Sequence, residues 1–248
     1  MSLAFVCPVL GKYEGQYWNC NSCGYMKVKE PTWLAEAYEQ TITSADVGLL
    51  RRNIAYSEKI AVIIDEYLNL DDVFLDYAGG YGVFSRLMRD AGFKFLHDDP
   101  YTENIFAKEY EFDGYKGSIG GLTCFECLEH FVNPFAELEK IFKISRNVIF
   151  STVLKPDLVP ELNWDYYGFE HGQHVSFYSS RALQEIGRRF GLRVFSAGNL
   201  HFFTEQPISQ AKFTRLVRGA SKKPHLFAKR TRFATLSRKL SKRRSSVK

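Results

Sequence analysis

The feature that most constrains the fold is a short apolar run followed by a glycine-rich turn. The run, Val73–Leu75, is typical of a buried parallel strand, and it ends at Asp76. The turn occupies residues 78–82, and residues 83–92 then show helical periodicity that stops at a glycine. Residues 93–96 form a second apolar run. Because a helix between two strands makes a parallel crossover, this order predicts an α/β fold.

The turn has the composition of a ligand-binding loop. Small residues let the backbone approach a ligand, and the following helix directs its N-terminus toward it. A carboxylate after the second strand, Asp98 or Asp99, can accept hydrogen bonds from ribose hydroxyls. This combination favours a cofactor that contains adenosine. A nicotinamide oxidoreductase is less consistent with the sequence. Its G-x-G-x-x-G motif would begin at Gly80 and Gly82, but the position of its third glycine is occupied by Ser85.

The loop resembles the D-x-G-x-G-x-G loop of class I S-adenosylmethionine (SAM)-dependent methyltransferases. Asp76, Gly80 and Gly82 match, and Ala78 replaces the first glycine, which tests whether that position needs a positive φ. Asp99 falls where that family keeps its ribose-binding acid, with Asp98 as the neighbouring candidate. On the loop alone, a structural glycine turn in another α/β protein remains an alternative.

Two later segments strengthen the resemblance. Residues 126–134 resemble the E-x-L-E-H-x-x-x-P segment of methyltransferases related to those of ubiquinone and polysaccharide biosynthesis, and residues 174–179 resemble their H-V-x-x-F/Y-S segment. The likeness runs from Val73 to Phe195 and implies a Rossmann-like, doubly wound, mainly parallel sheet with SAM as cofactor. The cofactor-binding residues that it implies are Asp76, Tyr77, Ala78, Gly80, Gly82, Asp98, Asp99 and Glu126; the catalytic candidates are Glu129, His130 and His174.

The resemblance implies methyl transfer to a small molecule or a sugar, most simply onto oxygen. A histidine suits removal of the acceptor proton, since its ordinary pKa lies near neutrality. Structural alternatives remain open. Glu129 and His130 can cap the next helix, and His174 can anchor the aromatic loop, by which we mean residues 164–174. Glu126, Glu129, His130 and a later histidine also resemble the divalent-metal set of small-RNA 2′-O-methyltransferases and of metal-dependent ubiquinone O-methyltransferases. A metal-dependent RNA 2′-O-methyltransferase and a non-catalytic SAM-binding relative are therefore the alternative functions.

The N-terminal residues contain an incomplete zinc-ribbon pattern. Cys20 and Cys23 form one C-x-x-C pair, but Leu10 stands where the partner of Cys7 belongs. Cys7, Cys20 and Cys23 are the predicted zinc ligands if a fourth ligand completes the site; otherwise the segment is a small Cys-bearing β-hairpin. The later pair, Cys124 and Cys127, lies on an apolar strand and is predicted to pack in the core.

Charge divides the chain unevenly. Residues 212–248 hold fourteen Lys and Arg and no acid, although the net charge of the whole chain is only +5. The expected organisation is a Cys-bearing element over 1–45, a methyltransferase domain over 46–208 and a basic tail over 209–248, for which an amphipathic helix is one alternative. The tail favours an anionic membrane surface or nucleic acid as partner, with a solvated chain end as the alternative.

The cellular compartment is predicted from three features that the sequence does not show. No apolar run reaches the length of a membrane span, the first residues lack the pattern of a secretory signal, and the five cysteines suggest no disulfide framework. A cytoplasmic protein, peripheral at the membrane through its tail, is expected; the oligomeric state stays open. Other helices are expected over 49–68, 101–111, 135–144 and 180–190. Further strands are expected over 147–152, 175–178 and, as the last strand, 192–195, and residues 122–130 are expected to form a strand that runs into a polar turn.

Overall fold

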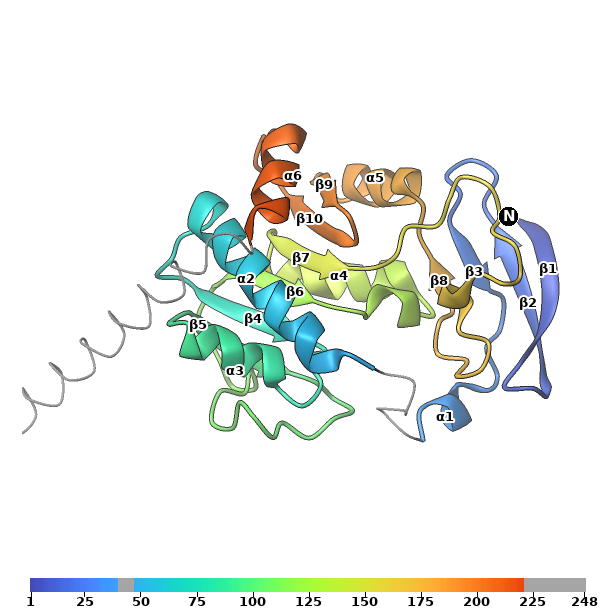
Figure 1. Cartoon of the computed structure of the whole chain (residues 1–248), viewed down its shortest axis with the longest axis horizontal. Coiled ribbons are helices and arrows are strands. Elements are labelled where there is room, and N and C mark those ends of the chain that lie inside the picture. The colour runs from blue at the N-terminus through green and yellow to red at the C-terminus, as the bar shows by residue number, and fades with distance from the viewer. Residues whose placement is uncertain (40–46, 221–248) are drawn as a thin grey trace, which may run out of the picture. The chain divides into compact units, whose positions relative to one another are not determined.

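The computed structural model describes residues 1–39 and 47–220 (Figure 1). The chain forms two compact units, each built from two stretches of sequence. We call Met1–Asp46 with Thr123–Ile208 the first unit, and Val47–Leu122 with Ser209–Lys248 the second unit. The residues expected to form a separate N-terminal element thus lie in one unit with the second half of the expected methyltransferase domain.

The larger sheet has six strands in the order β5-β4-β6-β7-β10-β9. Strands β4 and β5 are parallel, and β10 runs antiparallel to β7 and β9, so the sheet is mixed but mostly parallel, as the sequence predicted. The strand order is not sequential, which requires crossover connections of the kind that helices provide. The strands are β4 (Val73–Tyr77), β5 (Lys94–Asp98), β6 (Ile119–Cys124), β7 (Val148–Ser151), β9 (Arg193–Ala197) and β10 (Leu200–Thr204).

The helices of the second unit bury the apolar residues that the sequence pattern predicts, except in the first half of α2 (Leu49–Tyr67). Helix α2 buries its second half, including Ile60 and Ile64. Leu50 and Ile54 are exposed, although their helical spacing places them roughly on the same face as these two residues. Helix α3 (Val83–Asp90) buries its apolar face. Helix α6 (Gln210–Arg218) packs Phe213 against Tyr67 of α2. It lies at the start of the expected basic tail, whose main part, residues 221–248, is outside the described residues.

The predicted helix over residues 101–111 is wrong. Side chains take the backbone donors of this segment instead: the Asp99 carboxylate accepts the N–H groups of Tyr101 and Thr102, and Asn104 Oδ1 accepts that of Ala107. Asp and Asn compete with helical hydrogen bonds in this way. The segment therefore forms a loop, in which Glu109 adopts a positive φ of 72°.

The helices of the first unit begin where capping residues predict. Asn133 caps α4 (Pro134–Ile144), and Ser179 caps α5 (Ser180–Arg189), each by accepting a backbone N–H. The expectation that 192–195 is the last strand is wrong, because β9 turns at Gly198 into β10. Strand β10 forms an antiparallel hairpin with β9, which is the last strand in the order of the sheet.

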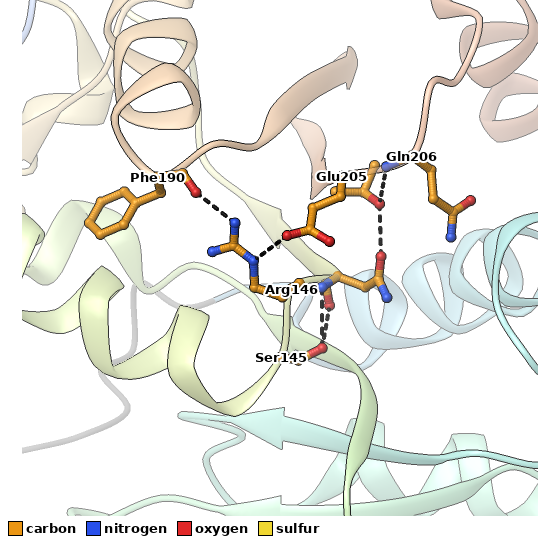
Figure 2. Close-up of polar contacts among 7 residues, drawn as sticks. Ser145, Arg146, Phe190, Glu205 and Gln206 are labelled. Carbon is orange, nitrogen blue, oxygen red and sulfur yellow. Dashed lines mark hydrogen bonds and ion pairs between the residues drawn. The ribbon is translucent and has the colours of Figure 1, made fainter.

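An arginine anchors the turn between α4 and β7. Arg146 Nε donates to Glu205 at 2.8 Å, and its Nη2 donates to the Phe190 carbonyl at 2.6 Å. Figure 2 shows the guanidinium between these two groups. Asn147, the next residue, accepts a bond from Thr204 at the end of β10. The contacts tie three segments of the first unit together at the start of β7.

The smaller sheet is antiparallel, in the order β1-β2-β3-β8 (Figure 1). The predicted strand at 175–178 exists as β8 (Ser176–Phe177), but it pairs with β3 in this sheet. Trp33 lies beneath it, 1% exposed, and its Nε1 donates to the Gly172 carbonyl at 2.7 Å. The N-terminal strands are therefore packed onto the aromatic loop of their own unit. They are β1 (Ser2–Val9), β2 (Tyr13–Asn19) and β3 (Met26–Val28), followed by α1 (Leu34–Ala37).

Candidate functional site

The glycine loop of the second unit follows β4 directly. Asp76 is buried and accepts a hydrogen bond from Ser85 of α3, which ties the end of the strand to the helix. Ala78 has a φ of 55°, so the position where the family keeps its first glycine does require a left-handed backbone. Gly82 has a φ of 82°, and a Cβ there would lie 2.6 Å from Asn104 Oδ1. Tyr77, half-buried, ends the strand.

The two carboxylates after β5 have different surroundings. The Asp99 carboxylate accepts the N–H of Gly80 at 2.8 Å and the N–H groups of Tyr101 and Thr102 at 2.9 Å each. It therefore holds the glycine loop to the next loop. The Asp98 carboxylate accepts no hydrogen bond from the described residues, and burial raises its pKa above the ordinary value, with the charge of Asp99 adding to the effect. Asp98 is the better placed of the two to accept a ligand's hydroxyl groups.

A cavity of about 510 Å³ opens beside these carboxylates within the second unit. Asp98, Asp99, Phe112 and Asp113 are among the residues that line it. Such a mixture offers acceptors for hydroxyl groups and an aromatic face for a base. Phe112 and Asp113 were missed from the sequence, because they lie in a glycine-rich connection without a periodic pattern.

In the first unit, Glu129, His130 and His174 come together: one donor atom from each lies within 4.8 Å of the others. We call these three residues the histidine cluster. Glu129 and His130 lie on the 3₁₀ turn η1 (Leu128–His130), and His174 precedes β8. The sequence predicted all three as catalytic residues, and the structure brings them together although 44 positions separate His130 from His174.

Glu129 is completely buried. Its Oε1 accepts a hydrogen bond of 2.6 Å from the Tyr166 hydroxyl, while Oε2 has no partner among the described residues. Burial raises the pKa of Glu129 to about 8, and the nearby charge of Glu126 contributes, whereas the Tyr166 bond opposes the shift. Tyr166 also lies within 3.0 Å of the Thr152 hydroxyl. Tyr166 was not predicted as a site residue; its place in the aromatic loop was the only signal.

The two histidines of the cluster are neutral. Burial lowers the pKa of His130 to about 3 and that of His174 to about 4, and neighbouring imidazoles add to both shifts. His174 Nδ1 lies 2.7 Å from the Tyr166 carbonyl oxygen, and His130 Nδ1 lies 2.8 Å from the Tyr38 hydroxyl. Both rings are thus held through Nδ1. A neutral imidazole can accept a proton or bind a metal ion through its other nitrogen.

Glu126, which the sequence predicted to bind the cofactor, is not one of the three residues of the histidine cluster. Its N–H donates to Ser151 Oγ at 2.8 Å, and the same hydroxyl donates to Glu126 Oε1 at 2.5 Å. The backbone of Glu126 has a positive φ of 48°, a strained conformation for a residue with a side chain. Strand β7 therefore fixes this carboxylate at the end of β6.

The structure gives no support to a zinc site at Cys7, Cys20 and Cys23. All three are free thiols, and over residues 1–39 and 47–220 the histidine cluster is the group whose donors converge closely enough for a metal ion. A hydrogen bond with Ser22 lowers the pKa of Cys20 to about 6. Cys124 and Cys127 are buried, which confirms their predicted place in the core. None of the described helices has the length and apolarity of a membrane span.

Comparisons with known proteins place the chain in a family. The model described as a methyltransferase domain matches residues 50–197, more than half of the chain. No curated protein matches the sequence. The chain is similar in fold to magnesium protoporphyrin IX methyltransferase from Synechocystis PCC 6803 with bound S-adenosylhomocysteine (SAH): identity is 14% and the TM-score 0.46, over 68% of this chain and 90% of that one.

Two further solved structures are similar at the same level. TnmH is 14% identical, with a TM-score of 0.49 over 70% of this chain and 60% of its own. An O-methyltransferase family 2 protein from Planctomyces limnophilus DSM 3776, in complex with apigenin, is 13% identical, with a TM-score of 0.43 over 68% and 64%. The family match and the fold agree with the sequence motifs. The chain belongs to the methyltransferase-domain family and is a class I SAM-dependent methyltransferase.

Proposed function

We propose that this methyltransferase transfers the methyl group of SAM to a hydroxyl oxygen of a small molecule or a sugar. The observation that supports the choice of oxygen is the histidine cluster, in which one carboxyl and two imidazole donor atoms converge within 4.8 Å and offer acceptors for a hydroxyl proton. A hydroxyl needs such help because its ordinary pKa is far above neutrality.

We assign SAM to the glycine loop of the second unit. The small residues within 78–82 suit close approach of a ligand to the backbone, and Asp98, which lines the cavity, provides a carboxylate for both ribose hydroxyls. Asp99 has a supporting role, because its oxygens hold the N–H groups of Gly80, Tyr101 and Thr102. Buried Asp76 accepts a hydrogen bond from Ser85 and so links the strand before the loop to the helix after it.

The reaction is an in-line displacement at the methyl carbon. The acceptor oxygen forms the new C–O bond as the C–S bond breaks, the electron pair of that bond stays on sulfur, and SAH leaves. The hydroxyl proton is taken up by a general base. Alignment of the two reactants supplies much of the rate enhancement, and proton removal supplies the rest.

Deuterated SAM tests this proposal. The protein is incubated with a small-molecule extract and with nucleotide sugars in the presence of SAM bearing a CD₃ group, and products are found by mass spectrometry. We expect labelled methyl ethers, with formation slowed at least about tenfold in Glu129→Gln, the effect typical of losing a proton-transfer group. Label on nitrogen, sulfur or carbon would contradict the choice of oxygen. A 3′-terminal RNA ribose is included, since labelling there would favour the RNA alternative.

A further inference from the structure

The histidine cluster has the geometry of a metal centre. Glu129, His130 and His174 each present one donor atom, and these atoms lie within 4.8 Å of one another. All three residues lie in the first unit. His130 and His174 are half-buried, so small ligands can reach the cluster, while Glu129 is completely buried.

The hydrogen bonds of the two imidazoles leave their Nε2 atoms available. The Tyr166 carbonyl can only accept a hydrogen bond, so His174 Nδ1 carries the proton and the lone pair is on Nε2. His130 Nδ1 lies 2.8 Å from the Tyr38 hydroxyl, which can accept in the same way. Metal-binding histidines are held by such a second hydrogen bond, which fixes the tautomer and the orientation of the ring.

The Glu129 carboxylate is half satisfied. Tyr166 donates to Oε1 at 2.6 Å, but Oε2 is completely buried and has no partner among the described residues. Leaving a buried carboxylate oxygen unpaired is costly, and a cation bound at Oε2 would remove that cost. This unpaired oxygen is an observation independent of the convergence of the three donors.

We propose that Glu129, His130 and His174 bind a divalent transition-metal ion. Two of the three ligands are imidazole nitrogens, which favour zinc, iron, nickel or copper over magnesium, calcium or manganese. Glu126 is not among the converging donors, and its Oε1 accepts a hydrogen bond from Ser151; the site therefore has one carboxylate fewer than the set suggested by the E-x-x-E-H pattern. Three protein ligands leave open positions for an exchangeable ligand.

This inference rests on the proposed function for its role in catalysis. A hydroxyl oxygen bound at the open position would have a lowered pKa and would lose its proton at neutral pH. Two open positions would also favour an acceptor with two neighbouring oxygens, such as a vicinal diol or a catechol, because it could chelate the ion. The cluster would then act through the metal rather than as a free base.

Cobalt spectroscopy and calorimetry on the full-length, chelator-treated protein test the site. Cys20→Ser/Cys23→Ser is the background, since a C-x-x-C pair binds zinc and cobalt by itself. We expect Zn²⁺ and Co²⁺ to bind with a stoichiometry of one, with a visible Co²⁺ spectrum that lacks thiolate charge-transfer bands. Glu129→Gln should weaken binding by at least about tenfold, and the matched control Glu126→Gln should not. SAM binding by each variant shows that it is folded.

The results separate this inference from the proposed function. Absence of Zn²⁺ and Co²⁺ binding, or equal affinity in Glu129→Gln and its background, would overturn the metal site. Methyl transfer to a hydroxyl that survives chelation would also overturn it while leaving the proposed function intact. Metal binding that depends on Glu129, together with transfer only to a nitrogen acceptor, would keep the site and contradict the proposed function.

Discussion

Two adjacent aspartates show how residues of one kind acquire different roles. Asp99 accepts three backbone N–H groups and so maintains a loop, whereas the Asp98 carboxylate lines the cavity without a hydrogen-bond partner among the described residues. We therefore expect Asp98→Asn to weaken SAM binding about tenfold or more, since a hydrogen bond to a charged group contributes about 1.5–3 kcal/mol. Titration calorimetry measures the affinity, and the melting temperature should stay close to that of the wild type.

Asp99→Asn is the comparison for this pair. It weakens the acceptor for three N–H groups, so we expect a loss of about 1–3 kcal/mol in the free energy of unfolding, measured by urea denaturation. If Asp99→Asn left stability unchanged while Asp98→Asn left SAM affinity unchanged, the assignment of the two roles would be reversed.

The backbone at Ala78 gives a prediction about strain. Its φ of 55° costs an ordinary L-residue about 1–2 kcal/mol, and a β-branched side chain more. Ala78→Val should lower the free energy of unfolding by about 1–2 kcal/mol. Ala78→Gly should leave it within about 1 kcal/mol of the wild type, because relief of strain is offset by the entropy of glycine in the unfolded chain. Equal stability of the two variants would contradict a strained Ala78.

At this scale the motifs indicated which residues lie together, and the roles of these residues stay predictions. Asp76, Ala78, Gly82, Glu129, His130 and His174 all lie in the loop or the cluster that their motifs implied. Tyr166 and Tyr38 were not predicted, because a hydroxyl that fixes another side chain follows no spacing rule. The choice between Asp98 and Asp99 also depended on which of the two carboxylates accepts hydrogen bonds from backbone N–H groups. The sequence does not show this directly.

At the scale of elements, β10 contains a histidine that should make stability depend on pH. Burial lowers the pKa of His201 to about 4, and its Nε2 lies 3.1 Å from the Thr152 carbonyl. The unfolded chain binds a proton near pH 6.5. The contribution of neutral His201 is therefore complete above pH 6.5 and is lost as the pH falls from 6.5 to about 4, by up to about 3 kcal/mol.

His201→Gln tests this prediction. Glutamine can still donate to the Thr152 carbonyl but does not titrate, so the variant should lose less stability than the wild type between pH 7 and pH 4 in urea denaturation. Parallel pH profiles for the two proteins would show that His201 does not titrate as proposed.

The small antiparallel sheet gives a second prediction for elements. Trp33 is 1% exposed and bonds to Gly172, on the loop that leads into β8. Trp33→Ala should cost about 3–5 kcal/mol, the range for a large buried aromatic side chain. Leu3→Ala, at a side chain that is half exposed on β1, is the control and should cost less than about 1 kcal/mol. Similar values for both would mean that Trp33 is not part of a packed core.

Elements with a strong local signal were predicted, and those decided by other segments were not. Helices α4 and α5 follow their apolar spacing and side-chain caps, whereas α2 follows its apolar spacing only over its second half. The expected helix at 101–111 failed because Asp99 and Asn104 take its backbone donors, and β10 was missed although it is fully buried. The pairing of β8 with β3 depends on segments more than a hundred residues apart, which periodicity does not reveal.

At the scale of the whole molecule, the basic charge of residues 212–248 gives a prediction about partners. A cluster of Lys and Arg near an anionic surface contributes about 1 kcal/mol per residue, and salt weakens it. We expect the full chain to sediment with phosphatidylserine vesicles at low salt, and a variant ending at Ala220 to remain in the supernatant. Equal sedimentation of both proteins would remove the tail from membrane binding; preferential binding to RNA would favour nucleic acid instead.

Binding of SAM to the glycine loop is the claim on which the whole account depends, and ligand-dependent unfolding of the full chain tests it most directly. A ligand that binds only the native state raises the melting temperature, by about 2.7 kcal/mol of stabilisation at a hundred times its dissociation constant. The account predicts that SAM and SAH both raise the melting temperature, that NAD⁺ does not, and that Asp98→Asn reduces the SAM and SAH shifts. No shift with SAM or SAH, or a shift with NAD⁺ alone, would contradict it.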